Sequence, residues 1–426
     1  MSDKKVLKTV ILPVILSVVI IVSIITYIFV GNSTSVNAQD LSKNVTANKV
    51  SAETLPDDFI AATSDFSISL FKKSISASEN SLISPTSVAL ALGMTANGAD
   101  GNTLTQFKKL LGGGTLTIDQ LNKYYYTMSS NLQNDKTNKI HLANSIWYRQ
   151  DASLKVNPNF LQANADFYKA AAYKADFNSQ DTVKDINKWV KSNTNGLIDK
   201  IVDKIDADTI MYLFNTVLFE AEWKNAYKTA NVRDGKFTLS DGSNVSTKFM
   251  HSFESYLKSD TAQGFIKPYK GDKFSFVAIL PNESISLEDY IKSLDGKSFL
   301  NFVNSKSDDT ASIGLPKFKY DYEVSLVKPL KDLGFTEGFD SSKANFSKMA
   351  TSSDGNIYIG DLLHKTFIQV DELGTKAGAV TKVEMTETGM ALETKKVILN
   401  RPFVYAIIDN ETKLPLFIGT VMNPAK

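Results

Sequence analysis

The order of helix-like and strand-like segments most limits the fold that this chain can adopt. Helical patterns fill the first half of the globular part, where Phe59, Phe66 and Leu70 share one helical face. Ser84-Pro85 supplies a helix N-cap followed by proline at the first helical position. Long strand-like segments dominate the second half, among them FSFVAILP, KTFIQVDE, NRPFVYAIID and LPLFIGTVM. Helices followed by strands predict an α+β fold rather than alternating βαβ units.

The composition describes a globular chain that is held together by packing. Hydrophobic residues make up 43% of the 426 residues, 47 basic residues balance 46 acidic ones, and there is no cysteine. Disulfides, thiolate metal sites and cysteine catalysis are therefore excluded, while the apolar fraction can supply a large core. A nucleic-acid-binding surface needs a clustered excess of Lys and Arg, so we expect no nucleic-acid partner.

An uncharged run from Val10 to Val30 follows Lys4, Lys5 and Lys8 near the N-terminus. A bilayer is spanned by ~20 apolar residues, and the basic flank predicts that the N-terminal end of this run stays in the cytoplasm. Ala38 closes a small-residue pattern that is typical of signal-peptide cleavage. The run is thus a signal peptide or an uncleaved anchor, and we expect the rest of the chain to be extracellular, either secreted or tethered.

The chain is therefore expected to have three parts. Residues 1–38 form the signal or anchor segment, residues 39–56 a polar linker, and residues 57–426 one globular domain. The membrane enters this prediction only through residues 10–30, and only if they are not removed.

Motifs of the common enzyme classes are missing. The sequence has no G-x-S-x-G, no H-E-x-x-H and no phosphate-binding glycine loop. Its three histidines are His141, His251 and His364, and no acidic cluster has the spacing of a metal-binding loop. We therefore expect no enzymatic activity, no cofactor and no metal site, although a Ser-His-Asp triad is assembled in space and need not show in a sequence.

Six collinear segments, which cover roughly residues 57 to 426, resemble the serpin family. They are NSLISPTSVALALGMTANGADGNTLTQFKKLL (Asn80–Leu111), INKWVKSNTNGLIDKIV (Ile186–Val202), FNTVLFEAEWKNAY (Phe214–Tyr227), LPKFK (Leu315–Lys319), HKTFIQVDELGTKAGAVT (His364–Thr381) and RPFVYAIIDNETKLPLFIGTVMNP (Arg401–Pro424). The resemblance implies a serpin fold with three sheets, about eight or nine helices and an exposed reactive-centre loop.

The resemblance also implies a function, namely inhibition of serine-type endopeptidases by a suicide-substrate mechanism. The target protease cleaves the exposed loop and is acylated, and the N-terminal half of the loop then inserts into the main sheet as a new strand. The distorted protease stays trapped. The resemblance leaves open a non-inhibitory serpin-fold binding protein, and from a different class a hydrolase with an unrecognised triad. We expect the inhibitor to be a monomer.

The stretch GTKAGAVTKVEMTE, from Gly374 to Glu387, has the pattern that such an inserting strand requires. Side chains of a strand alternate between its two faces, and the face predicted to turn inward carries no charge. A buried unpaired charge on that face would cost several kcal/mol. By resemblance Glu372 and Gly374 belong to the hinge, and the inward face consists of Thr375, Ala377, Ala379, Thr381, Val383 and Met385. In the uncleaved protein we expect Thr375 to be exposed or partly buried, so that arginine there is tolerated.

The resemblance assigns two further groups of residues to the opening of the sheet. Lys317 and Trp223 match positions near the end of the main sheet where insertion begins. A polar cluster beneath the sheet is matched by Ser84, Ser87, Asn187 and His364. Simple roles as a core aromatic or as buried hydrogen-bonding groups are compatible with these positions.

The reactive bond follows from the usual loop length counted from Glu372. It falls at Thr388-Gly389, and the neighbouring residues Glu387 and Met390 mark the alternatives. Threonine before the cleaved bond suits a protease with a small or medium specificity pocket. The expected partners are therefore extracellular serine proteases of the elastase-like or subtilisin-like type.

Overall fold

The computed structural model describes residues 37–133, 135, 137–206, 209–353, 355–375 and 395–426, and residues 38–426 form one folded unit. The apolar run from Val10 to Val30 lies outside the described residues. So do Ala377, Ala379, Thr381, Val383, Met385, Glu387, Thr388, Gly389 and Met390. Within the described part of the chain, no helix combines the length and the apolarity that crossing a membrane requires.

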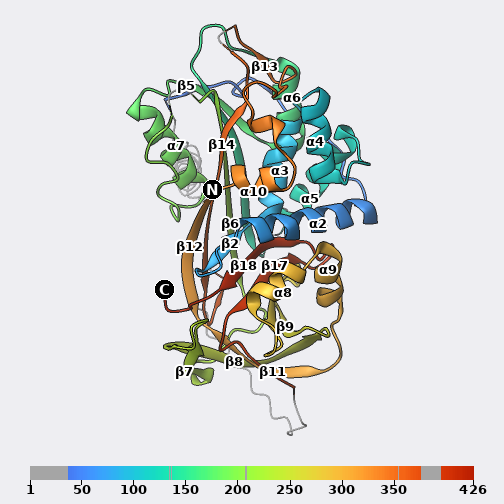
Figure 1. Cartoon of the computed structure of the whole chain (residues 1–426), viewed down its shortest axis with the longest axis vertical. Coiled ribbons are helices and arrows are strands. Elements are labelled where there is room, and N and C mark those ends of the chain that lie inside the picture. Colours follow the sequence, from blue (N-terminus) through green and yellow to red (C-terminus); the bar gives the residue numbers. More distant parts are fainter. Residues whose placement is uncertain (1–36, 134, 136, 207–208, 354, 376–394) are drawn as a thin grey trace, which may run out of the picture. The chain divides into compact units, whose positions relative to one another are not determined.

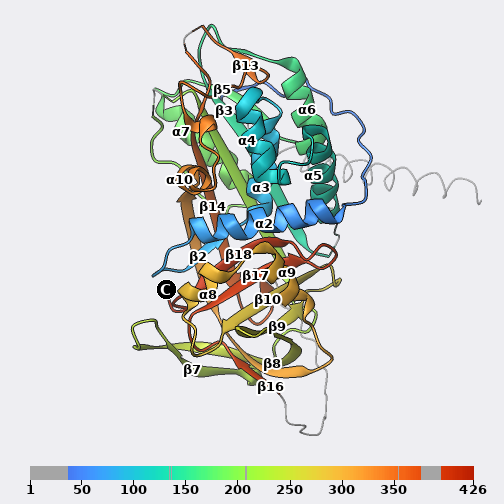
Figure 2. The ribbon, with the colours of Figure 1, turned by 45° about the vertical axis from the view of Figure 1, so that its right-hand side comes forward.

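Nine α-helices occur in the described residues, most of them in the first half of the chain. They are α2 (Asp57–Ser74), α3 (Pro85–Ala96), α4 (Gly101–Gly112), α5 (Ile118–Gln133), α6 (Pro158–Tyr168), α7 (Gln180–Asn193), α8 (Leu287–Ser293), α9 (Gly296–Asn304) and α10 (Val327–Asp332). Helix α2 crosses between the tall sheet and the strand-rich lower part of the unit (Figure 2).

The tall sheet has seven strands in the order β1-β5-β3-β6-β15-β14-β12. Their bounds are β1 (Gln39–Asp40), β5 (Ala171–Ala175), β3 (Lys139–Arg149), β6 (Met211–Glu222), β15 (Gly374–Thr375), β14 (Ile359–Val370) and β12 (Phe318–Ser325). Helices α3 and α7 lie on opposite sides of its long strands (Figure 1). Of the residues that the sequence predicts to be functional, Gly374, Thr375 and His364 lie on strands of this sheet, and Trp223 and Lys317 lie directly beside the ends of β6 and β12.

A nine-stranded sheet forms the lower part, with a path β16-β11-β8-β9-β10-β17-β18-β2 and β7 paired to β8. Its strands are β2 (Ser81–Ile83), β7 (Val232–Thr238), β8 (Asn244–Lys258), β9 (Ala262–Pro268), β10 (Phe274–Pro281), β11 (Thr310–Pro316), β16 (Lys395–Ile398), β17 (Phe403–Asp409) and β18 (Pro415–Val421). A two-stranded sheet, β4 (Lys155–Val156) with β13 (Ala350–Thr351), completes the set. The predicted α+β fold with three sheets and about nine helices is confirmed.

Helix α3 shows how the sequence builds the centre of the unit. Its segment PTSVALALGMTA is small or apolar on every face, and all of its residues are buried. A helix that is hydrophobic all round must pack on several sides at once, and α3 contacts β3, β6 and β18. The predicted N-cap is confirmed, since the Ser84 side chain accepts a hydrogen bond from the Ser87 N–H. The start of this helix is fixed against the tall sheet by a second bond, which the Ser84 N–H donates to His364 of β14 at 3.0 Å.

The segment predicted to be a linker lies along the domain surface. Strand β1 pairs with the edge strand β5, and the Leu41 N–H donates to the Ala172 carbonyl at 2.8 Å. Farther along, the Asn48 N–H donates to the Asp166 carboxylate at 2.7 Å. An edge strand offers a row of unpaired backbone groups, which explains why a polar segment without periodicity of its own is held there.

Candidate functional site

The seven-stranded sheet is split at one end between β6 and β14. The two strands pair in parallel from Met211 and Ile359 up to Thr216 and Lys365. Beyond that point the short strand β15 lies between them, with Thr375 opposite Ala221 of β6 and opposite Val370 of β14. Residues 217–220 of β6 and 366–369 of β14 are not paired with each other in the described sheet. We call this interval the slot, and β15 stands at its mouth.

Strand β15 is already part of the sheet. Thr375 is only 2% exposed, and its hydroxyl shares a 2.5 Å hydrogen bond with the Tyr269 hydroxyl. Gly374 is required beside it, because a Cβ at this position would come within 2.0 Å of the Ala221 carbonyl oxygen. The expectation that Thr375 is exposed or partly buried, and tolerant of arginine, is therefore wrong. Its side chain faces the interior, as the alternation predicts, but it is already buried in the sheet.

Trp223 holds the turn that leads into β15. Its backbone N–H donates to the Leu373 carbonyl at 2.9 Å, and its indole N–H donates to the Asp371 carbonyl at 2.8 Å. Its ring stacks on Tyr269, with centroids 4.6 Å apart and planes at 8°. Trp223 is therefore more than a core aromatic. Its two N–H groups hold the backbone just before Thr375, and its ring packs against Tyr269, the hydrogen-bond partner of Thr375.

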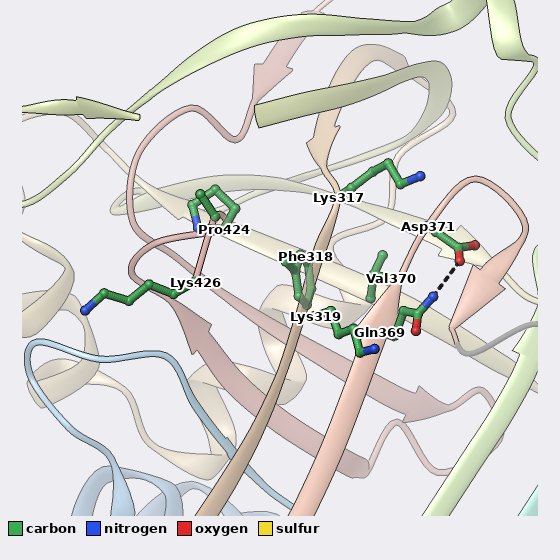
Figure 3. A pocket seen from close by; sticks show the side chains of 9 residues that line it. Lys317, Phe318, Lys319, Gln369, Val370, Asp371, Pro424 and Lys426 are labelled. Atoms are coloured by element: carbon green, nitrogen blue, oxygen red, sulfur yellow. Dashed lines mark hydrogen bonds between the residues drawn. The ribbon is translucent and has the colours of Figure 1, made fainter. Parts of the chain in front are cut away.

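Glu372 and Lys317 form an ion pair beside the mouth, at 2.5 Å and with both side chains about one-third exposed. Partial burial acts to raise the pKa of Glu372, but the hydrogen bond and charge of Lys317 outweigh it and hold the pKa below its usual value. Lys317 also lines a pocket of about 330 Å³ between β12, β14 and the C-terminal residues (Figure 3). The pair thus links the residue between β11 and β12 to the turn before β15.

A buried ion pair under Trp223 was not predicted from the sequence. The Lys267 ammonium lies 2.5 Å from the Glu254 carboxylate, with side chains 2% and 10% exposed. The same ammonium is 4.4 Å from the ring centre of Tyr227. Burial lowers the pKa of Lys267, and the Glu254 charge opposes that effect. A lysine inside the apolar strand segment QGFIKP was the available signal, because charges are buried only when they are paired.

A buried polar cluster lies where the pairing of β6 with β14 ends. The Ser84 N–H donates to Nε2 of His364 at 3.0 Å, so Nδ1 carries the proton and donates to Oδ1 of Asn215 at 2.9 Å. The Asn215 amide in turn donates to the Ser87 carbonyl at 3.0 Å and to Asn144 Oδ1 at 2.5 Å. Three predicted residues, Ser84, Ser87 and His364, therefore meet beneath the sheet.

Asn187 does not belong to this polar cluster, contrary to expectation. It lies on α7, where its Oδ1 accepts from the Ile201 and Val202 N–H groups and its amide donates to the Val202 carbonyl at 2.8 Å. These bonds fix the chain that follows α7. The asparagine in the cluster is Asn215, whose signal in the sequence is a single amide inside the apolar run YLFNTVLF.

Neutral His364 is what the cluster requires. Burial without a charged partner lowers the pKa of His364 to about 3. Protonation would turn Nε2 into a second donor facing the Ser84 N–H, so the cluster would lose an acceptor. The cluster is therefore stable only while the imidazole is uncharged.

We predict that Thr375→Arg destabilises the uncleaved protein. A guanidinium would replace a hydroxyl in a site that is almost fully buried, where the hydrogen-bond partner of the side chain is the uncharged hydroxyl of Tyr269. The free energy of unfolding should fall by ~3–5 kcal/mol, measured by urea denaturation. The matched control is Thr351→Arg, at the exposed position of strand β13, where a change within ~0.5 kcal/mol is expected. Equal effects of the two substitutions would contradict the burial of Thr375.

We also predict a loss of stability in acid that depends on His364. In the unfolded chain this histidine has its ordinary pKa of ~6.5, whereas in the folded chain it is lowered to about 3. Between these values the unfolded state binds the extra proton, so stability falls as the pH falls. From pH 7 to pH 4.5 the loss from this group is roughly 2–3 kcal/mol.

The measurement compares urea denaturation of the natural chain and of His364→Asn at both pH values. The variant is expected to be less stable at neutral pH. Its free energy of unfolding should fall less on acidification, because the contribution of His364, roughly 2–3 kcal/mol, is missing. The same fall in both proteins would show that His364 is not held neutral.

Comparisons with known proteins agree with this architecture. The Serpin family model, described as serine protease inhibitor, matches residues 61–424. Neuroserpin of Homo sapiens is 29% identical over 387 residues, which are 87% of this chain and 92% of neuroserpin.

Crystal structures of the thermophilic serpin Tengpin are also similar. The native state has 50% identity, a TM-score of 0.87 and coverage of 91% of this chain and 99% of Tengpin. The latent state has 49% identity, a TM-score of 0.77 and coverage of 87% and 99%. The chain therefore belongs to the serpin family.

Proposed function

We propose that this serpin inhibits serine proteases as a suicide substrate, with the loop after Thr375 inserting into the slot. The observation that carries the proposal is the slot itself. Its two walls are adjacent strands of one sheet that are unpaired between residues 217–220 and 366–369, and β15 already lies between them at the mouth. The chain that continues from β15 is the alternating segment of the sequence.

The register of β15 specifies where each loop residue would lie after insertion. Thr375 is opposite Ala221 and Val370. If the strand continues antiparallel to both walls, Ala377 comes to lie between Phe219 and Ile368, which are 5% and 2% exposed. The apolar side chain of Ala377 would then lie between two buried apolar side chains.

The same register places Thr381, a polar residue of the inward face, at the polar cluster. Thr381 would lie between Asn215 and His364, which are fully buried and already hydrogen-bonded to each other. A hydroxyl can donate and accept in such a place. The next inward residue, Val383, would lie between Leu213 and Leu362, both fully buried apolar side chains. The inward face of the loop and the interior of the sheet therefore match in polarity along the whole path.

Insertion would be driven by backbone pairing and by apolar burial. Each new hydrogen bond of the ladder contributes ~0.5–1.5 kcal/mol, and each large apolar side chain such as Val383 or Met385 contributes ~1.5–3 kcal/mol. The sum is comparable with the stability of a whole domain, which is ~5–15 kcal/mol. The uncleaved protein would then be kinetically rather than thermodynamically stable.

Two sets of contacts are proposed to control the opening of the slot. At the mouth, Trp223 and the Glu372–Lys317 pair hold the hinge. At the far end, the cluster of Ser84, Ser87, Asn215 and His364 joins the two walls to the helix beneath. Each must rearrange when β6 and β14 part.

The reactive bond is proposed to be Thr388-Gly389, within a residue or two. A threonine before the cleaved bond suits elastase-like or subtilisin-like proteases. Such targets act outside the cell, so we propose that the domain is extracellular, secreted or tethered through residues 10–30. Recovery of the full-length chain from the soluble cytoplasm of expressing cells would refute both locations.

The proposal is tested by mixing the full-length chain with elastase or with subtilisin and separating the products by SDS gel electrophoresis. A covalent complex that survives SDS supports the inhibitor. Cleavage of the loop without a complex would instead support a non-inhibitory serpin-fold binding protein. Hydrolysis of a peptide substrate by the chain alone would point to an enzyme.

We predict that Ala379→Arg converts the inhibitor into a substrate. In the register above, this residue lies between Val217 and Thr366, which are 4% and 0% exposed, so an arginine would be buried during insertion. A barrier raised by ~2.7 kcal/mol slows insertion about a hundredfold, and deacylation would then release active protease. The gel should show cleaved chain and little complex.

The control for this variant is Lys376→Gln, at an alternate position that the register turns outward. It should form the complex with unchanged stoichiometry. If Ala379→Arg traps protease as well as the natural chain does, the proposed register of insertion is wrong.

A further inference from the structure

A second pocket lies away from the slot, at the end of the nine-stranded sheet. It has a volume of about 860 Å³ and is lined by the ends of β8, β9 and β10 on one side and by β16 and the chain that follows it on the other. Small-molecule sites in proteins usually have volumes of ~300–1,000 Å³. Its lining residues contribute to neither the slot nor the polar cluster.

Three cations from different parts of the chain line this pocket. Lys258 ends β8, Lys396 belongs to β16, and Arg401 precedes β17. Among the described residues none of the three has a carboxylate within ion-pair distance, which is 4.0 Å. Glu283 is the one acidic residue of the lining. The pocket therefore carries an excess of positive charge that the described part of the protein does not neutralise.

Arg401 is the most constrained of the three. It is partly buried, and its Nη2 donates to the Pro281 carbonyl oxygen at 2.6 Å. A guanidinium has five N–H donors, and the described residues accept this one hydrogen bond from it. Burial lowers the pKa of Arg401, and the Glu283 charge acts against that effect. An anion near Arg401 would supply hydrogen-bond acceptors for the other N–H groups of the guanidinium.

The rest of the lining suits a small polar ligand. Gln263 and Asn282 bring amides, and Tyr256 donates a long hydrogen bond of 3.4 Å to Gln263 Oε1, which leaves the amide N–H groups of Gln263 available. Leu280 and Ile398 supply apolar surface. Donors of several kinds converge on one concave space, which distinguishes this pocket from a flat patch of lysines.

We propose that this pocket binds a compact oxyanion with two or three carboxylate or phosphate groups, held between Lys258, Lys396 and Arg401. A bound anion would tie β16 to the end of β8 and to the residues before β17. That link matters because β16 is an edge strand whose one neighbour in the described sheet is β11. The inference goes beyond the proposed inhibition and does not depend on it, because binding is measured without any protease.

The test is isothermal titration calorimetry of the full-length chain at constant ionic strength. Pyrophosphate and propane-1,2,3-tricarboxylate are the two probes, which distinguish a phosphate ligand from a carboxylate ligand, and acetate is the singly charged reference. We expect saturable one-to-one binding of at least one probe and none of acetate. The double variant Lys258→Ala/Lys396→Ala should weaken binding roughly a hundredfold, about tenfold for each charge-assisted contact.

The matched control removes two exposed lysines elsewhere, as Lys155→Ala/Lys297→Ala. This variant has the same net charge as the pocket variant and should bind like the natural chain. Arg401→Lys keeps the charge but loses the planar fork of donors, and it should bind more weakly than the natural chain. The proposal is overturned if neither probe binds, or if the pocket variant and the control variant bind equally well.

Discussion

The pairing of β15 with both β6 and β14 is the constraint on which the rest of the site depends. Two residues, Gly374 and Thr375, keep the walls of the slot apart at its mouth, while the same two strands pair directly at the far end. Between β15 and the far end of the slot, the two walls are not paired with each other in the described sheet. Backbone N–H and C=O groups along this interval therefore do not bond from one wall to the other. In the function proposed above, the chain that follows Thr375 completes the strand begun by β15 and supplies partners for those groups.

The two ends of the slot are closed by different kinds of interaction. At the mouth, aromatic stacking and backbone hydrogen bonds from Trp223 meet a partly exposed ion pair, Glu372–Lys317. At the far end, His364 and Asn215 form a fully buried network that holds only one arrangement of donors and acceptors. Buried networks of this kind are strong when complete and costly when one member is lost. The contacts at the mouth are thus partly exposed, whereas those at the far end are fully buried.

Much of this arrangement could be predicted from local sequence. The N-cap at Ser84, the helical faces and the period of two after Gly374 each arise from residues that are neighbours in the chain, so pattern alone indicates them. The inward direction of Thr375 was predicted for the same reason. Its burial was not, because that depends on Trp223 and Tyr269, which lie far from Thr375 in the sequence.

The assignment of Asn187 to the polar cluster was wrong for a related reason. Asn187 stands in a well-matched segment, but α7 carries it to the chain around Val202. Asn215 is an isolated amide in a buried strand, and only its packing against Ser87 and His364 shows its partners. The Lys267–Glu254 pair and the cation-lined pocket likewise join strands that the sequence does not relate.

The most direct test of the central claim is the thermal stability of the chain before and after the loop is cut. Limited proteolysis near Thr388, followed by unfolding monitored by circular dichroism, compares the two states of one protein. If the cut loop fills the slot, several kcal/mol of new pairing and burial should raise the unfolding midpoint by ~10 °C or more. Equal midpoints for the intact and the cleaved chain would contradict the account, because the slot would then have remained empty.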